Sequence, residues 1–212
     1  MTRLTKTWAI LLSLLFFAAC SDPASDQPRA VTKEAAPAPS APSAPAGAQR
    51  YLITPENSKI DFIGSKVTGS HNGSFQKFSG VIEYAGAPEK SRVQITIDMT
   101  SVTTDAAKLT EHLKTADFFD VAKYPQATFQ STEIKPGGEK GATHTITGNF
   151  QLHGVTKSIT FPATIGVSGD TITVDSTFSV NRKDFGVNYA GASDDLIRDN
   201  VVMTLRIRAT KG

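Results

Sequence analysis

Apolar and polar residues alternate one by one along most of the chain after residue 51, and this pattern restricts the chain to β-sheet structure. In Arg92–Met99 every second side chain is apolar, and the alternation returns in 171–180 and in 201–209. Successive side chains of a strand point to opposite faces of its sheet, so each segment is expected to be a strand with one apolar face. Similar patterns predict further strands at Ile60–Val67, Phe75–Tyr84, Ala127–Ile134, Thr143–Leu152 and Ser158–Val167.

About eight antiparallel strands with one apolar face each must cover that face, which a sandwich or a barrel achieves. A barrel also removes exposed sheet edges. A barrel of about eight strands has room for its own side chains or for one small ligand. The alternation therefore predicts an all-β domain, but it does not choose between barrel and sandwich, and it does not tell whether the interior is filled.

Turn residues separate the expected strands. Asn72-Gly73 is expected to form a tight hairpin, because these residue types tolerate positive φ. Further breaks are expected at 136–138, at His153-Gly154 and at 168–170, where glycine lies between two strands.

One segment has a helical period instead. In Asp105–Thr115, Ala106, Leu109 and Leu113 fall on one face of a helix. This short helix is a candidate lid for one end of a barrel, and the alternative is that it only plugs the barrel base.

The first nineteen residues have the features of a signal peptide. Arg3 and Lys6 form a positively charged start, 8–17 is almost wholly apolar, and Ala18 and Ala19 precede the expected cleavage point. The apolar run is too short to span a bilayer, which takes roughly 20 residues.

Cleavage would leave Cys20, the only cysteine of the chain, as the first residue. The segment 17–20 resembles the lipobox of bacterial lipoproteins, which implies that Cys20 is acylated and anchored in a membrane. Two or more acyl chains hold a protein firmly. By resemblance to enteric lipoproteins, Ser21 in place of aspartate permits sorting to the outer membrane, and we expect a lipid-anchored, periplasm-facing protein of the bacterial cell envelope at that membrane.

Residues 20–50 combine the lipidated cysteine with an Ala/Pro-rich linker. Six of the eleven prolines lie here, and such a composition buries little apolar surface and favours an extended chain. At about 3.1 Å per residue, thirty extended residues would reach on the order of 90 Å. The sequence therefore predicts a spacer that precedes one folded domain at 51–212.

Charge and motifs exclude several classes of protein. The chain has 22 Lys plus Arg and 20 Asp plus Glu, and loss of Arg3 and Lys6 with the signal peptide leaves 20 of each. This balance is not that of a nucleic-acid-binding protein. The four histidines have no metal-ligand spacing, and no phosphate loop, dinucleotide fingerprint or Gly-x-Ser-x-Gly motif is present. No metal site and no catalytic residue are therefore expected.

A series of short motifs carries a resemblance to a known family. They are Ser58–Phe62, His71–Phe75, Phe78–Gly80, Ile97–Thr104, His112-Leu113, Asp117–Asp120, Pro125–Ser131, Gly148–Lys157 and Asn181–Val187. Through them, Tyr51–Thr210 resembles the YceI family of bacterial periplasmic proteins.

The resemblance implies an eight-stranded antiparallel lipocalin-like β-barrel with a short helical insertion. It also implies a non-enzymatic protein that holds a polyisoprenoid or similar long-chain lipid, a quinone among them, without a covalent link. The resemblance is also compatible with a homodimer. Two alternatives are a packed barrel that binds other envelope proteins and an enzyme with histidine-assisted hydrolysis.

A tunnel for a prenyl chain needs apolar walls and a polar mouth. Any single wall residue is equally consistent with ordinary core packing. The candidate wall residues are Phe62, Phe75, Val93, Ile95, Ile97, Leu109, Leu113, Phe118, Phe150, Phe161, Phe178 and Leu205.

Arg182 is the candidate polar residue of the site. Its planar guanidinium is suited to an anionic or carbonyl headgroup. The simpler alternative is that Arg182 pairs with a carboxylate, such as Asp184 or Asp199, and braces the end of a strand.

Overall fold

The computed structural model describes residues 22–37, 45 and 47–212. The strands are β1 Val31–Glu34, β2 Gln49–Ile53, β3 Lys59–Lys66, β4 Gly69–Phe75, β5 Phe78–Tyr84, β6 Arg92–Asp98, β7 Val102–Thr104, β8 Gln126–Pro136, β9 His144–Leu152, β10 Val155–Ser168, β11 Thr171–Asn181, β12 Gly191–Ala192, β13 Asp195–Leu196 and β14 Asn200–Lys211. The helices are α1 Ala107–Lys114 and the 3-10 turns η1 Pro88–Lys90, η2 Met99–Ser101, η3 Glu139–Gly141 and η4 Arg182–Phe185. Among the described residues, no helix is long and apolar enough to cross a bilayer.

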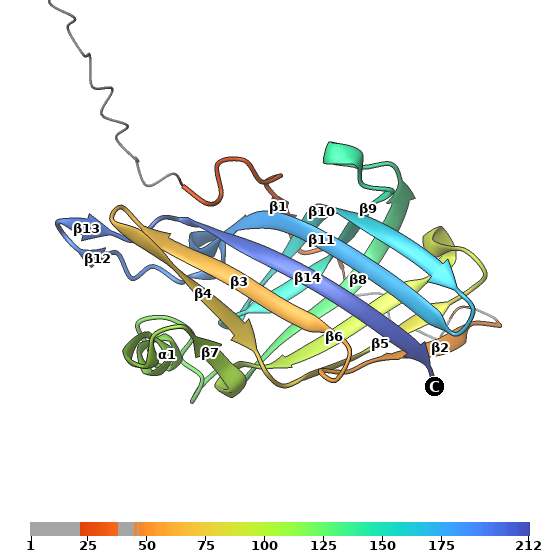
Figure 1. Cartoon of the computed structure of the whole chain (residues 1–212), viewed down its shortest axis with the longest axis horizontal. Helices are drawn as coiled ribbons and strands as arrows, with labels where there is room; N and C mark the ends of the chain where they lie inside the picture. Colours follow the sequence, from red (N-terminus) through yellow and green to blue (C-terminus); the bar gives the residue numbers. More distant parts are fainter. Residues whose placement is uncertain (1–21, 38–44, 46) are drawn as a thin grey trace, which may run out of the picture.

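Eight of these strands form a closed antiparallel barrel, in the order β10-β9-β8-β6-β5-β2-β14-β11 and back to β10. Figure 1 shows α1, β12 and β13 at one end of the molecule and the C-terminus at the other. We call these the α1 end and the C-terminal end. The expected all-β, lipocalin-like barrel with one short helix is confirmed, so the choice that the alternation left open is decided in favour of a barrel.

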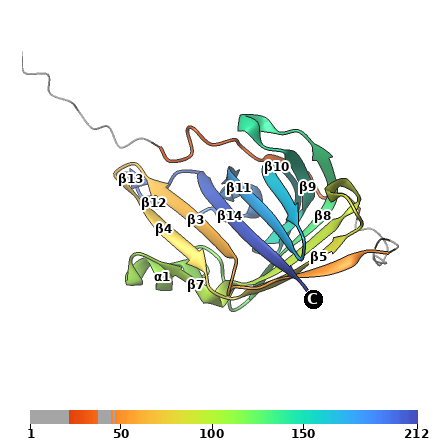
Figure 2. The ribbon, with the colours of Figure 1, turned by 45° about the vertical axis from the view of Figure 1, so that its right-hand side comes forward.

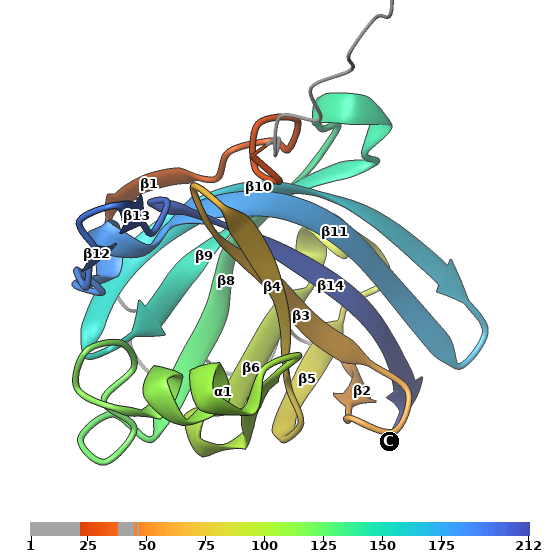
Figure 3. The ribbon, with the colours of Figure 1, turned by 60° about the vertical axis from the view of Figure 1, so that its left-hand side comes forward.

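The eight strands of the closed ring are the eight expected ones with a single difference: β2 takes the place that was expected for β3. The same edge of β14 pairs with β2 through Thr210 and Lys211 and with β3 through Val202–Arg206. β2 belongs to the closed ring although its sequence was not expected to form a strand. β3 instead begins a branch that continues through β4 and β7 and extends toward the α1 end (Figure 3).

The expected hairpin at Asn72-Gly73 is wrong, because both residues lie inside β4. The turn between β3 and β4 is at Val67 and Thr68 instead. Gly73 pairs with Phe62 of β3, and a Cβ atom on Gly73 would lie 2.1 Å from the end of the Phe62 ring. Glycine is needed here because an aromatic ring covers the backbone.

The expectation of an extended spacer is wrong for residues 22–36, which we call the N-terminal strap. β10 pairs with β11 only through 164–168, so the two strands separate toward the α1 end. The strap fills this opening: the amide of Ala30 donates to Ser179 of β11 (2.8 Å), and β1 pairs with 157–160 of β10. A vacant strand edge is costly, which explains why a proline-flanked segment of low apolar content docks there.

Side-chain contacts hold the far end of the strap as well. The amide of Asn149 in β9 forms two reciprocal hydrogen bonds with the backbone of Ala36, at 2.9 and 3.0 Å. Lys157 of β10 pairs with Glu34 at 2.6 Å. Figure 2 shows the strap lying along the outside of the barrel wall. The expected signal peptide and Cys20 lie outside the described residues.

Candidate functional site

The barrel encloses a cavity of about 390 Å³. Its wall is made by inward-facing side chains of the ring strands, and α1 and the turn after it complete the wall at one end. The cavity reaches from Val93 and Val174 inside the barrel to Lys66 and His71 at the α1 end. The side chains of Lys66 and His71 are about 40% exposed, so the cavity meets solvent at this end. The interior of the barrel is therefore hollow.

All of the candidate wall residues face this one cavity, and Arg182 lines it too. From the strands they are Phe62, Phe75, Val93, Ile95, Ile97, Phe150, Phe161, Phe178 and Leu205, and from α1 and the following turn they are Leu109, Leu113 and Phe118. The structure thus brings every one of them together, and their contact with a ligand stays a prediction.

Aromatic rings pack against one another around the cavity instead of filling it. Phe161 and Phe178 are stacked, with ring centroids 4.3 Å apart, and Phe129 lies 5.7 Å from Phe161. Phe62 and Phe75 form a second pair at 5.5 Å. Rings at such separations attract each other, so these contacts hold the wall in place around the hollow.

Several wall residues escaped the sequence analysis. Met203 and Ile207 lie two residues to either side of Leu205, on the same face of β14, and they line the cavity with it. Period two alone was enough to find them. Phe129 was harder to find from the sequence. Its ring lies over Gly148 of the neighbouring strand, where a Cβ atom would approach the ring to 2.4 Å, so the only sequence sign of this contact is the glycine itself.

The helix α1 lies at the open end of the cavity. Leu113 is buried, Leu109 is half-buried, and both side chains line the cavity. The rings of His112, Phe118 and Tyr189 meet beside it, with centroids 5.0–5.1 Å apart. Of the two roles considered for the helix, this position agrees with the lid, because α1 lies at the end where the exposed side chains of Lys66 and His71 line the cavity.

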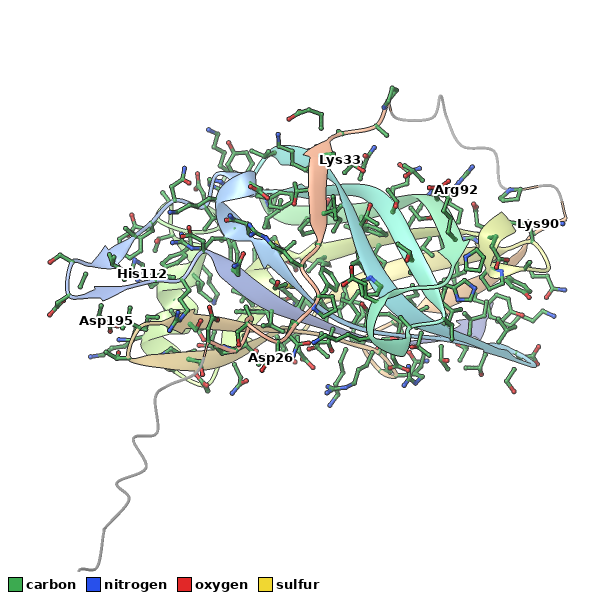
Figure 4. The ribbon with its side chains drawn as sticks, turned by 90° about the horizontal axis from the view of Figure 1, so that it is seen from above. Asp26, Lys33, Lys90, Arg92, His112 and Asp195 are labelled. Carbon is green, nitrogen blue, oxygen red and sulfur yellow. The ribbon has the colours of Figure 1, made fainter. Side chains whose placement is uncertain are left out.

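Charged groups gather where the cavity opens. Asp105 accepts hydrogen bonds from the amide of Asn72 (2.9 Å) and from His71 (2.7 Å), and these contacts lower the pKa of Asp105. Lys66 pairs with Asp195 of β13 and lowers the pKa of that carboxyl group. Figure 4 shows His112 and Asp195 at this end of the molecule and Lys90 and Arg92 at the other. The cavity thus has an apolar interior and a polar mouth.

Arg182 is buried in this mouth, and its donors are used by the protein itself. Nη1 donates to the carbonyl of Val187 (2.7 Å), Nε to that of Arg198 (3.1 Å) and Nη2 to that of Ile197 (3.3 Å). Asp199 lies 3.7 Å from Nη2. Burial lowers the pKa of Arg182, and the charge of Asp199 opposes this shift. The geometry therefore agrees with the bracing role: the three carbonyls accept the hydrogen bonds of Arg182, and Asp199 is the neighbouring carboxylate.

The described residues contain no group of three or more His, Cys, Asp or Glu side chains arranged to hold a metal ion. His71 lines the cavity beside Asp105, whereas His153 lies in the β9–β10 turn against the ring of Tyr124. The chemistry that this site offers is enclosure of an apolar molecule, with polar groups at one end only.

Comparison with known proteins agrees with this geometry. Residues 51–209 match the YceI-like domain. A UPF0312 protein of Pseudomonas putida strain W619 is 36% identical over 133 residues, 59% of this chain and 68% of the relative. A UPF0312 protein of Pseudomonas syringae pv. tomato is 34% identical over 157 residues, 69% of this chain and 81% of the relative.

Solved structures show the same fold. BcnA of Burkholderia cenocepacia superposes with a TM-score of 0.66 at 27% identity, over 74% of this chain and 99% of its own. A polyisoprenoid binding domain of Saccharophagus degradans superposes with a TM-score of 0.62 at 19% identity, over 78% of this chain and 99% of its own. With three quarters of its length matched, this chain belongs to the YceI-like family.

Proposed function

We propose that this protein is a membrane-anchored lipoprotein that binds or carries a polyisoprenoid, or a similar long-chain lipid such as a quinone, inside its barrel. The observation that carries the proposal is the apolar cavity of about 390 Å³ that opens at the α1 end. Ligand sites typically measure about 300–1,000 Å³ and have apolar walls with a few polar groups.

The distribution of polar groups suits an amphiphile. A hydrocarbon tail would lie against the phenylalanine-rich wall, and each buried CH₂ group contributes about 0.8 kcal/mol before the opposing entropy terms. A polar headgroup would stay near Lys66 and His71, at the mouth. Such binding needs no covalent bond, which agrees with a carrier that must also release its ligand.

The Saccharophagus degradans neighbour supports this ligand class, because that domain is described as polyisoprenoid binding. The anchor at Cys20, removal of residues 1–19, and a periplasm-facing position at the outer membrane are parts of the same proposal, and they rest on the sequence. The homodimer also stays a prediction, which sedimentation of the purified protein would test.

The direct experiment is mass spectrometry of organic extracts from the purified full-length protein. The extracts should contain a long-chain prenyl lipid in near-equimolar amount. A protein that is lipid-free and takes up no prenyl lipid from vesicles would overturn the proposal.

Two variants in adjacent positions of β14 sharpen this test. In L205W the new ring enters the cavity that Leu205 lines, so bound lipid should be lost. In T204W the same ring is added on the opposite face of the strand, so lipid should be retained. Circular dichroism confirms that both variants are folded. Equal lipid content in the two folded variants would contradict binding in the cavity.

A further inference from the structure

The α1 end carries a group of exposed apolar side chains around the cavity mouth. Val67 in the β3–β4 turn is 54% exposed, Leu196 in β13 is 49% exposed, and Tyr189, just before β12, is 37% exposed. These three residues, which we call the rim, do not line the cavity. Their side chains are therefore not needed to hold the ligand.

Backbone contacts join the parts of the rim to one another and to the mouth. The amide of Val67 donates to the carbonyl of Leu196 at 3.2 Å. Lys66, directly before Val67, and Ile197, directly after Leu196, form an isolated antiparallel bridge, and both line the cavity. Tyr189 contacts the ring of Phe118 inside the mouth. The apolar tips thus project directly beside the opening.

The N-terminal strap begins at the same end. Asp22 pairs with Arg198 at 3.5 Å, and the amide of Arg198 donates to Ser65, a residue of the cavity mouth. Cys20 is two residues before Asp22, and two residues span at most about 7 Å. An acyl chain on Cys20 would therefore leave the protein close to the rim, not at the end of a long spacer.

We propose that the rim seats on the surface of the bilayer that holds the N-terminal anchor, with the cavity mouth against the lipid. This inference rests on the proposed lipid-binding function and adds the partner surface and the orientation. A bilayer explains both observations: an acyl chain needs one nearby, and apolar tips beside the cavity mouth are shielded when they enter its interface.

Apolar contact, not charge, holds this surface on the bilayer. Six charged side chains near the rim form three ion pairs, Lys66 with Asp195, Asp22 with Arg198, and Lys183 with Asp199. Docking is therefore expected to change little with ionic strength or with the fraction of anionic lipid. The prenyl chain would pass between the bilayer and the barrel without crossing water.

Single tryptophans test the orientation. The only tryptophan of the chain is Trp8, within the expected signal peptide, so the processed protein has no tryptophan fluorescence of its own. V67W and L196W place the reporter on the rim. V167W is the matched control, because Val167 is 42% exposed and lies in β10 near its turn to β11, at the C-terminal end.

The protein is purified from membranes and reconstituted into phosphatidylcholine vesicles with brominated acyl chains, with and without phosphatidylglycerol. V67W and L196W should lose most of their emission relative to unbrominated vesicles, at low and at high salt, whereas V167W keeps its emission. Equal quenching in all three variants, or no quenching at the rim, overturns the proposal.

Two further readings separate this proposal from other outcomes. A blue shift of the rim variants without vesicles, growing with protein concentration, would show that a second copy covers the rim and would overturn bilayer docking. Lipid extracted from the same samples reports on the proposed function independently. Bound lipid with an unquenched rim would reject the docking alone, and a quenched rim with no lipid uptake would reject the carrier function alone.

Discussion

Replacing Arg182 by methionine separates the two roles considered for this residue. The guanidinium lies at the cavity mouth, yet it donates to the carbonyls of Val187, Ile197 and Arg198. It thereby ties η4 to the segment that leads into β14. Methionine keeps most of the aliphatic stem and removes every donor, so R182M leaves the three carbonyls without these partners.

The expected loss of stability follows from burial. Arg182 is only 5% exposed. A hydrogen bond to a charged group contributes about 1.5–3 kcal/mol, and removal of one partner from a buried charged network typically costs about 3–5 kcal/mol. Part of the loss is recovered because the guanidinium no longer has to be desolvated. We expect R182M to lower the free energy of unfolding by about 3–5 kcal/mol, measured by urea unfolding.

The neighbouring K183M variant is the control. Lys183 is half-exposed and pairs with Asp199 at 2.9 Å, and an exposed pair of this kind contributes about 0–1 kcal/mol. R182K should fall between the two, because one ammonium group cannot reproduce the planar fork. The bracing role would be refuted in favour of headgroup binding by two results together: a free energy of unfolding of R182M within about 1 kcal/mol of that of the unchanged protein, and loss of bound lipid from the folded variant.

Three further predictions concern the barrel wall, the Lys66–Asp195 pair and the N-terminal strap. G148A should lower the free energy of unfolding in urea by about 1–3 kcal/mol, because the new Cβ would lie 2.5 Å from a backbone carbonyl oxygen. The control G64A, whose Cβ would have nothing within 4 Å, should be neutral or slightly stabilising. Equal changes in stability for the two variants would contradict this account. Because its pKa is lowered, Asp195 contributes fully to stability above the usual carboxyl pKa of about 3.9, and this contribution is lost only as the pH falls through its lower folded pKa. Hydrogen exchange in the β3–β4 turn, corrected for intrinsic rates, should therefore rise only at acidic pH. A rise near neutrality would contradict the role of the Lys66–Asp195 pair. Deletion of the N-terminal strap should speed exchange of the Ser179 amide, which donates to the strap at 2.8 Å; unchanged exchange would mean that the strap is not docked.

The local pattern predicted most of the strands, and every wall residue that was proposed from the sequence lines the cavity, although Met203, Ile207 and Phe129 were missed. In β6 and β14 the alternation is regular, and period two assigns Val93 or Leu205 to the apolar face without reference to any other strand. The breaks at His153-Gly154 and at 168–170 were also readable, because positive φ at Gly154 and Gly169 is a local requirement.

The errors lie where a distant segment decides the conformation. Asn72-Gly73 has the composition of a turn, but the ring of Phe62 on the neighbouring strand makes it a strand position. Residues 22–36 have the composition of a spacer, but an unpaired edge of β10 captures them. A short run without proline, Arg29–Ala36, was the only signal, and it becomes meaningful only once that vacant edge is known.

The sequence by itself determined the all-β class, the apolar faces and, through the family resemblance, the barrel. Only the tertiary structure decided that these faces surround an open volume, that β2 and not β3 closes the ring, and that Arg182 binds backbone carbonyls. The physical reason is that alternation is a property of neighbouring residues. A void, a strand edge and a hydrogen-bond partner instead depend on which residues meet from far apart in the chain.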